Sequence, residues 1–506
     1  KIYNAYRLAY EEKDRPTVIL AFTIKGYGIG SRQADNTAHQ VKKLTTENLE
    51  DFIEKFNLPI KKNSLDDPKF LTLDGDKKTK EYLFSRREEL GGFLPLRKVS
   101  KEKLIPDKNS FADFEKKLDR EQSTTMVFVR LLTKLLRDSS IGQRVVTIVP
   151  DEARTFGMDA LFRQFGIYSS EGQKYEPEDA DKVMFYRESE SGIMLEEGIN
   201  EAGAFSAWLA LATSYSNNNL PMIPFYIFYS MFGFQRIHDL AWAAGDSRAK
   251  GFLLGATSGR TTLNGEGLQH QDGHSHILAS TIPNCRSYDP CYSYELAAII
   301  QEGIKDMYEE GNDRYYYITL MNENYSHSAK PKKLKNEHIL KGAYKYKEHR
   351  KANLRILASG VTLNFALEAE KELKRFEINA DIWSVTSFNE LYREGVETER
   401  LNRLNSTSNK SYVQSCFNEE IPTIAVSEYQ RAYPNQIREW VKGDYIILGT
   451  DGFGRSDTRE ELRDFFEISK DHIVLNALLL QGKKKEAEKF IKDSNMVLNK
   501  EAPWKN

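Results

Sequence analysis

Short apolar runs and longer stretches with a helical spacing of apolar residues follow one another along most of the chain. The short runs are rich in β-branched and aromatic residues and predict buried strands at 17–24, 144–149, 222–228, 252–256, 315–320, 353–358, 380–385, 423–426 and 445–448. The longer stretches predict helices at 2–10, 124–136, 196–212, 234–244, 294–308, 361–376 and from 483 onward. This alternation predicts an α/β fold in which mostly parallel sheets are covered by helices.

Changes in composition divide the chain into four regions. With 506 residues, the chain is too long for a single core. Residues 1–45 combine a helix, a strand and the glycine-rich string KGYGIG with a polar stretch that predicts a mobile loop. Residues 46–106, rich in lysine, aspartate and proline, predict a connecting segment. We expect one α/β domain at 107–330 and, after the charged string PKKLKNEH, another at 331–506.

The composition excludes several classes of protein. The formal charge is −2 with charges of both signs, so neither nucleic acid nor an anionic membrane is an expected partner. The three cysteines lack CxxC spacing and cannot form a disulfide framework. All apolar runs are far shorter than the roughly 20 residues of a membrane helix. We therefore expect a cytoplasmic protein. Because it opens on Lys1 within an amphipathic stretch, we also expect it to be cut from inside a domain.

The string GEGLQHQDGHSH brings three histidines, His270, His274 and His276, close to Asp272. Its glycines predict a tight loop after the strand at 252–256, and loops at strand ends are where α/β sheets bind ligands. The spacing leaves three interpretations open: a metal site, a catalytic histidine that exchanges protons near physiological pH, and simple packing of the loop.

Glu201 lies in the string EEGINEAGAFSAWLALA, which predicts a helix with a face of small residues. Such a face indicates close packing, and a carboxyl group desolvated there would keep a proton available for donation. The alternative is an exposed carboxylate that suits the positive end of a helix. Further along, Tyr229, Phe232 and Phe234 mark a switch from strand to helix, where a ring can stack on a flat heterocycle.

Five strings carry a resemblance to one family. PDEARTFGM, EEGINEAGA, NNNLPMIPFYIFYSMFGFQRIHDL, SGRTTLNGEGLQHQDGHSH and LGTDGFGRSDTRE resemble, in the same order, segments of the single-chain, homodimeric-type bacterial pyruvate dehydrogenase E1 component. The similarity runs from the first predicted strand to about residue 467. It implies the thiamin-diphosphate-binding, transketolase-like fold, with a parallel-sheet pyrimidine domain at 107–330, an α/β C-terminal domain at 331–506 and the tail of a diphosphate-binding domain at 1–45.

The resemblance implies how this chain would hold the cofactor. It places on Glu201 the acid that hydrogen-bonds the aminopyrimidine of thiamin diphosphate, so that acid–base catalysis passes through the cofactor. Ile199 resembles the apolar wedge that bends the cofactor, and Phe232 resembles the ring stacked on its pyrimidine. Asp151 and Glu152 resemble acidic residues near the cofactor.

The same resemblance implies residues that act on the substrate. Tyr229 and His270 resemble positions that hydrogen-bond the substrate-derived part of the intermediate. His39, in the string NTAHQVKK, resembles a histidine on a loop that closes over the site and helps to pass on the acetyl group. The implied reaction is the decarboxylation of pyruvate followed by reductive acetylation of the lipoyl domain of the E2 acyltransferase. A homodimer with active sites between the subunits is implied as well.

One family motif is absent. The sequence has no GDG triplet followed by an asparagine. The resemblance therefore implies that the ligands of Mg²⁺ and of the diphosphate lie in a missing N-terminal part and that this chain contributes no metal ligand. We therefore expect the isolated fragment to be inactive. Two alternatives remain: a transketolase-like or other 2-oxo-acid E1 enzyme, and a catalytically silent interaction fragment.

Overall fold

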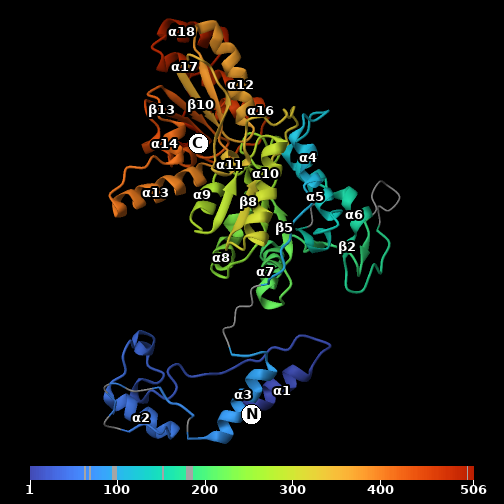
Figure 1. The fold of residues 1–506 in the computed structure, drawn as a ribbon, viewed down its shortest axis with the longest axis vertical. Coiled ribbons are helices and arrows are strands. Elements are labelled where there is room, and N and C mark those ends of the chain that lie inside the picture. The colour runs from blue at the N-terminus through green and yellow to red at the C-terminus, as the bar shows by residue number, and fades with distance from the viewer. Residues whose placement is uncertain are drawn as a thin grey trace. The chain divides into compact units, whose positions relative to one another are not determined.

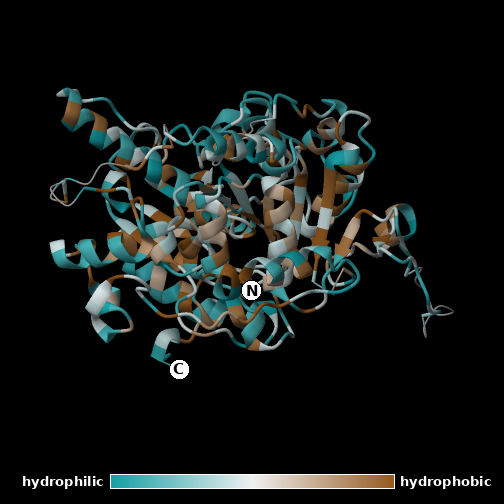
Figure 2. Ribbon diagram, turned by 90° about the horizontal axis from the view of Figure 1, so that it is seen from below, coloured by the Kyte–Doolittle hydropathy of each residue, from teal (hydrophilic) through white to brown (hydrophobic). Residues whose placement is uncertain are grey.

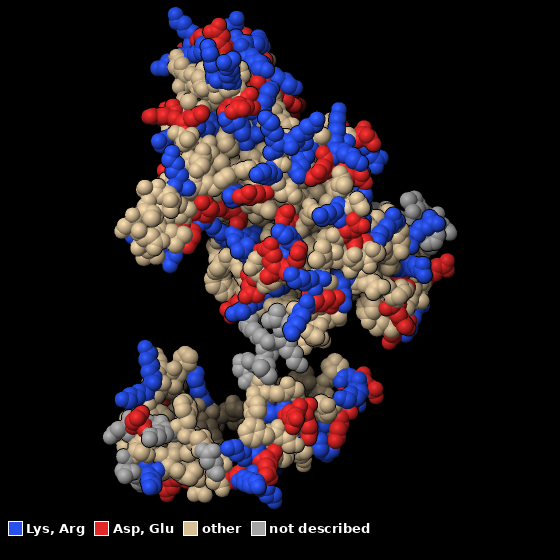
Figure 3. All heavy atoms as spheres, viewed as in Figure 1, with Lys and Arg blue, Asp and Glu red and all other residues tan. Residues whose placement is uncertain are grey.

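The computed structural model describes residues 1–61, 64–65, 67, 70–73, 75–93, 100–150, 153–177, 186–498 and 500–505 (Figure 1). The chain forms two compact units, Lys1–Leu96 and Arg97–Asn506. Acidic and basic side chains are interspersed on the face seen in Figure 3, so no large field of one sign covers it. None of the helices in the described ranges combines the length and the apolar character that crossing a bilayer requires.

The first unit is built from helices. They are α1 (Ile2–Glu11), α2 (Thr46–Phe56) and α3 (Lys77–Glu89), with 3-10 turns at Gly30–Arg32 and Asn36–Gln40. The helix predicted at 2–10 is confirmed, but the buried strand predicted at 17–24 is wrong. Val18, Leu20 and Phe22 are 80%, 92% and 101% exposed. A strand needs a neighbour for its backbone groups, and the described residues of this unit contain no strand that could pair with it.

An eight-stranded sheet forms the middle of the second unit. Its order is β3-β2-β4-β1-β5-β6-β8-β7, and all its neighbouring pairs run parallel. The strands are β1 (Val145–Val149), β2 (Ile167–Tyr168), β3 (Glu188–Ser189), β4 (Met194–Glu196), β5 (Ile223–Phe228), β6 (Phe252–Gly255), β7 (Cys285–Tyr288) and β8 (Tyr315–Thr319). The helices around it are α4 (Asn109–Ala112), α5 (Thr124–Leu136), α6 (Asp159–Phe165), α7 (Glu201–Asn217), α8 (Gly233–Asp246), α9 (Ser275–Ser280) and α10 (Ser293–Ile304).

Both faces of this sheet are buried, as β5 illustrates. Its residues alternate between two cores: Phe225 and Ile227 pack with α5 and α10, whereas Tyr226 and Phe228 pack with α7 and α8. A strand covered on both sides is apolar at every position, which is why the sequence predicted the central strands well. Figure 2 shows the same distribution, with brown gathered in the interior and teal over the outer helices.

A five-stranded sheet follows in the second unit. Its order is β13-β12-β10-β11-β9. Only β9 pairs antiparallel, against β11. The strands are β9 (Tyr344–Lys347), β10 (Leu354–Ala358), β11 (Ala380–Ser384), β12 (Thr423–Val426) and β13 (Tyr445–Leu448). The helices are α11 (Asn336–Leu340), α12 (Thr362–Leu373), α13 (Phe388–Asn405), α14 (Tyr412–Cys416), α15 (Ala432–Asn435), α16 (Arg459–Phe465), α17 (Lys470–Leu480) and α18 (Lys484–Asp493).

The helix predicted from residue 196 begins later than expected. Strand β4 ends at Glu196, and α7 begins at Glu201. Two residues set this boundary. Gly198 has a left-handed φ of 72°, which breaks the extended backbone, and the side chain of Asn200 accepts a hydrogen bond from the Gly203 N–H at 3.0 Å, which caps the helix. Glu201 is therefore the first residue of its helix.

The two sheets are joined by a buried carboxyl group. Glu295, in the first turn of α10, is fully buried. It accepts hydrogen bonds from the backbone N–H groups of Cys291 at 2.6 Å and Tyr292 at 2.9 Å. The hydroxyl groups of Tyr344 on β9 and Ser384 on β11 donate to its other oxygen at 2.5 and 2.6 Å. The cap of a helix on the first sheet is thus completed by strands of the second.

Asp289 gives this junction a pH dependence. It is the residue that follows β7, its side chain is buried, and the Thr319 hydroxyl donates to its carboxyl group at 2.7 Å. Burial raises its pKa from the usual 3.8 to about 7, a shift that hydrogen bonds from Thr319 and Ser359 only partly offset. Between these two values the folded chain holds a proton that the unfolded chain has lost. Stability is therefore lost as the pH rises from about 4 to about 7, at roughly 1.4 kcal/mol per pH unit.

We expect Asp289→Asn to remove this contribution. Urea unfolding of both proteins between pH 4 and pH 8 should show the free energy of unfolding of the wild type falling relative to that of the variant. The neutral His276, whose pKa is lowered to about 3 by burial, gives the opposite slope below about pH 6.5, but it is present in both proteins and cancels in the difference. Parallel curves would show that Asp289 does not hold the proton.

Candidate active site

A turn between β5 and α8 presents two aromatic rings. Tyr229 and Phe232 lie in this turn, half-buried, and the Phe232 N–H donates to the Tyr229 carbonyl at 3.0 Å. The next residue must be glycine, because a Cβ on Gly233 would lie 2.0 Å from the ring of Phe228. Close packing of α8 on the end of β5 therefore sets the direction in which the turn faces.

His270 meets these two rings from another segment. It ends a 3-10 turn, Leu268–His270, in the loop that follows β6. Its ring centre lies 5.2 Å from that of Tyr229 and 5.2 Å from that of Phe232, and the centres of Tyr229 and Phe232 are 5.9 Å apart. Within the described ranges the buried Nδ1 of His270 has no hydrogen-bond partner, and the carboxylate of Glu266 lies 3.8 Å from it. The structure thus brings three of the predicted residues into one cluster.

Glu201 reaches the same cluster through an arginine. Its side chain is 12% exposed, and one carboxylate oxygen lies 2.5 Å from the guanidinium of Arg236 on α8. That guanidinium also lies 4.1 Å from the ring centre of Phe232, within the range of a cation–π contact. The sequence did not predict this ion pair. The position of Arg236, four residues after Phe232 on the same face of a helix, indicates only the contact between the arginine and the ring.

The other predicted residues are placed differently. Ile199 is 70% exposed, just before the cap of α7. Phe234 is buried and packs edge-on against Tyr317, with ring centres 4.8 Å apart, so it belongs to the core. His39 lies in the first unit, where its Nδ1 is 2.9 Å from the Nζ of Lys25. Asp151 and Glu152 lie outside the described residues.

The three neighbouring histidines do not converge. His274 is 2.8 Å from the side-chain nitrogen of Gln235. His276 is fully buried, lies 2.9 Å from the Thr319 hydroxyl and stacks on Tyr433. No group of three or more metal-ligating side chains was found in the ranges that the structure describes. His276 therefore packs in the core, whereas His270 lies beside the rings of Tyr229 and Phe232.

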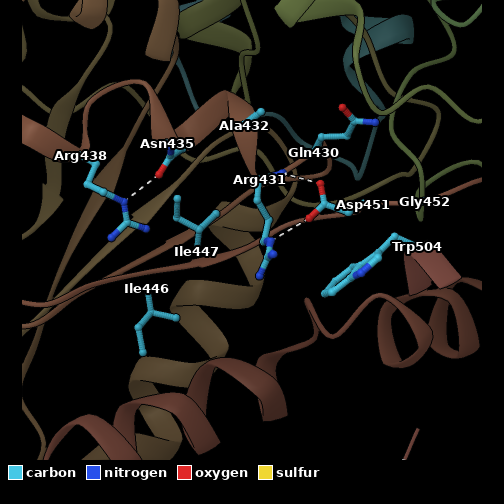
Figure 4. A pocket seen from close by; sticks show the side chains of 10 residues that line it. All are labelled: Gln430, Arg431, Ala432, Asn435, Arg438, Ile446, Ile447, Asp451, Gly452 and Trp504. Carbon is cyan, nitrogen blue, oxygen red and sulfur yellow. Dashed lines mark hydrogen bonds and ion pairs between the residues drawn. The ribbon is translucent and has the colours of Figure 1, made fainter. Parts of the chain in front are cut away.

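A groove of about 820 Å³ lies away from this cluster, beside β13 (Figure 4). Arg431 and Arg438 both line it, but each already has a partner. Arg431 pairs with Asp451 at 2.7 Å, and Arg438 donates to the side chain of Asn435 at 2.7 Å. Both arginines that line the groove are therefore already engaged by neighbouring side chains.

Solved structures with the same fold define the class of this protein. Transketolase from Campylobacter jejuni superposes with a TM-score of 0.65 at 17% identity, over 94% of this chain and 65% of that one. Transketolase from Leishmania mexicana gives a TM-score of 0.65 at 17% identity, over 96% of this chain and 64% of that one. The chain therefore has the thiamin-diphosphate-binding, transketolase-like fold.

Sequence comparison identifies the family. The model of the pyruvate dehydrogenase E1 component middle domain matches residues 104–328, and that of the transketolase-like C-terminal domain matches residues 342–469. The chain is 55% identical to the pyruvate dehydrogenase E1 component of Pseudomonas aeruginosa over 94% of its length, and 48% identical to that of Escherichia coli over 97%. It belongs to the pyruvate dehydrogenase E1 component family. It spans 55% and 56% of the length of these two relatives.

Proposed function

We propose that this chain supplies the pyrimidine-binding side of a thiamin-diphosphate site that decarboxylates pyruvate and transfers the acetyl group to the lipoyl domain of E2. The observation that carries the proposal is the cluster of Glu201, Phe232, Tyr229 and His270, formed from three separate segments in a member of the pyruvate dehydrogenase E1 family. Ionisable and aromatic side chains that converge at strand ends are typical of α/β active sites.

The residues of the cluster fit the cofactor. A flat heterocycle with ring nitrogens needs an aromatic face, a carboxyl group and polar atoms that can turn toward it. Phe232 offers a half-buried ring, Glu201 a carboxyl group that is 12% exposed, and His270 a buried Nδ1 with no partner among the described residues. When bound, thiamin diphosphate would supply a carbon nucleophile and accept the electron pair that stays behind when carbon dioxide leaves.

Glu201 would hold and return the proton at the pyrimidine nitrogen. To do so it would exchange Arg236, its present partner at 2.5 Å, for the cofactor. Phe232 would stack on the pyrimidine, and the exposed Ile199 would be the apolar wedge that bends the cofactor. Because Arg236 also lies over Phe232, we propose that this arginine leaves both groups together.

Tyr229 and His270 would act on the substrate. The centres of their rings lie 5.2 Å apart. At this separation the Tyr229 hydroxyl and the His270 imidazole could both point at an oxygen that becomes negatively charged as carbon dioxide leaves. We assign Asp151 and Glu152 to the surroundings of the cofactor and His39 to acetyl transfer. Mg²⁺ and the diphosphate would be held by the part of the relatives that this chain does not span, in a cytoplasmic homodimer whose sites lie between subunits.

Substrate preference tests the proposal. We expect the complete protein to release carbon dioxide from pyruvate only with thiamin diphosphate and Mg²⁺, and at least about a hundredfold faster than it converts 2-oxoglutarate or xylulose 5-phosphate, since an unpaired polar group in a specific site costs several kcal/mol. Reductive acetylation of a lipoyl domain should follow. Preference for xylulose 5-phosphate or 2-oxoglutarate would favour a transketolase or another 2-oxo-acid E1 enzyme. No turnover of any of these substrates would favour the silent interaction fragment.

A further inference from the structure

The loop that carries His270 is held from the C-terminal side of the second unit. We call residues 263–274 the histidine loop and residues 450–457 the clamp loop, which follows β13. The Gly265 N–H donates to the Asp457 carbonyl at 3.1 Å. At the other end, the Gln430 N–H donates to the Gly273 carbonyl at 2.7 Å. Both ends of the histidine loop are therefore bonded to the part of the chain that forms the five-stranded sheet.

Gln271 makes the central bond between the two loops. Its side chain is completely buried. Its amide nitrogen donates to the Leu263 carbonyl at 2.7 Å, and its amide oxygen accepts from the Arg455 N–H at 2.7 Å. One side chain must therefore donate at one end and accept at the other. Glutamine does this without charge, which a carboxylate of the same length cannot do because it only accepts.

The backbones of the two loops approach closely beside this bond. A Cβ on Gly454 would lie 2.4 Å from the Leu268 carbonyl oxygen and 2.9 Å from the side chain of Gln271. Only a glycine at position 454 permits this close approach of the two backbones. Arg260, which stands just before the histidine loop, adds a bond to the clamp loop, since its guanidinium donates to the Thr450 carbonyl at 2.6 Å. The position of the histidine loop thus depends on the clamp loop at several points.

We propose that Gln271 is a positioning residue through which the C-terminal part of the chain fixes His270 in the site; the inference rests on the proposed function. Among the described residues, Nδ1 of His270 has no hydrogen bond that could orient the ring. Its place is set by the rings of Tyr229 and Phe232 and by its own backbone, which Gln271 anchors one residue later. Loss of that anchor moves the imidazole away from the oxygen it would stabilise.

Hydrogen exchange on this chain tests whether Gln271 holds the loop. Gln271→Met keeps the length of the side chain and removes both hydrogen bonds. We expect amides of the histidine loop to exchange at least about tenfold faster, since local opening follows the loss of such bonds. Gln481→Met is the matched control, because Gln481 donates to the Asn353 carbonyl at 2.7 Å elsewhere in the C-terminal part. It should leave exchange of the histidine loop unchanged. Equal exchange in wild type and Gln271→Met would overturn the proposal.

Turnover of the complete protein tests whether the effect passes through His270. We expect Gln271→Met to lower kcat by about ten- to a hundredfold, the effect of a catalytic group displaced by roughly 1 Å, with unchanged affinity for thiamin diphosphate. In a His270→Ala background the same change should cost little, because the group it positions is already gone. Independent, multiplicative losses would overturn the proposal. If His270→Ala alone has normal turnover, the proposed role of His270 fails; if it is impaired and Gln271→Met is not, only the positioning role fails.

A milder variant covers the case in which Gln271→Met does not fold. Gln271→Glu still accepts from the Arg455 N–H, but it can donate to the Leu263 carbonyl only when protonated. We expect protection of the histidine loop, corrected for intrinsic exchange, to approach that of the wild type at pH 5 and to fall at pH 8. Protection that is independent of pH, and equal to that of the wild type, would contradict the proposal.

Discussion

Glu201→Gln is expected to lower pyruvate turnover by the complete protein about a hundred- to ten-thousandfold, the usual contribution of a positioned acid. Glutamine has the same shape and can still accept a hydrogen bond from Arg236, so the ion pair is replaced by a hydrogen bond from the charged guanidinium to a neutral amide and the helix is kept. What it loses is the proton that the proposed chemistry requires. The measurement is the rate of carbon dioxide release at saturating pyruvate and thiamin diphosphate.

Glu197→Gln is the matched control for this prediction. Glu197 lies four residues earlier in the same segment and is exposed, so its amide should leave turnover within about twofold of the wild type, since such surface changes are usually small. Both variants should unfold at the temperature of the wild type to within a few degrees. If Glu201→Gln turned over pyruvate at the normal rate, the proposed role of this carboxyl group would be wrong.

Glu295→Ala is expected to be the most destabilising of the substitutions considered for this chain. It leaves four buried donors without their acceptor: the N–H groups of Cys291 and Tyr292 and the hydroxyls of Tyr344 and Ser384. An unsatisfied buried donor costs about 1–3 kcal/mol, so even partial rearrangement leaves a loss of roughly 4 kcal/mol or more. Urea unfolding of the chain measures the loss.

Two further variants separate hydrogen bonding from other causes. Glu295→Gln retains one accepting oxygen and should lose clearly less stability than Glu295→Ala. Glu302→Ala removes a carboxylate from the same helix, where it is 28% exposed and 4.0 Å from Lys305; a pair of that kind contributes at most about 1 kcal/mol. Equal losses for Glu295→Ala and Glu302→Ala would contradict the assigned role of Glu295.

The sequence predicted the strands that are continuously apolar and missed strands that carry polar residues. Strands β12 and β13 lie where the apolar runs placed them, at Thr423–Val426 and Tyr445–Leu448. Strand β7, with the sequence CRSY, and strand β9, with the sequence YKYK, lie at sheet edges. Polar residues are tolerated there, so no continuous apolar run marks these strands.

The sequence predicted only those residues of the candidate site that stand in distinctive local motifs. Glu201, Tyr229, Phe232 and His270 each stand in a distinctive string, and the structure joins them. The ion pair of Arg236 was missed because its partner, Glu201, lies 35 residues away in sequence. Gln271 was missed as an anchor for the same reason: it is bonded to Arg455, 184 residues further along. Contacts of this length leave no periodic signal in the sequence.

The sharing of Glu295 between two sheets also bears on how this protein is made. As the nascent chain leaves the ribosome, the first sheet is fully synthesised once β8 has emerged. Ser384, one of the donors to Glu295, lies 89 residues after Glu295 and emerges later than β8. Until then the carboxyl group of Glu295 lacks at least one of its four donors. At a typical elongation rate of about 5–20 residues per second, this leaves several seconds in which a folding helper or a degrading enzyme meets the first sheet before the cap of α10 is complete.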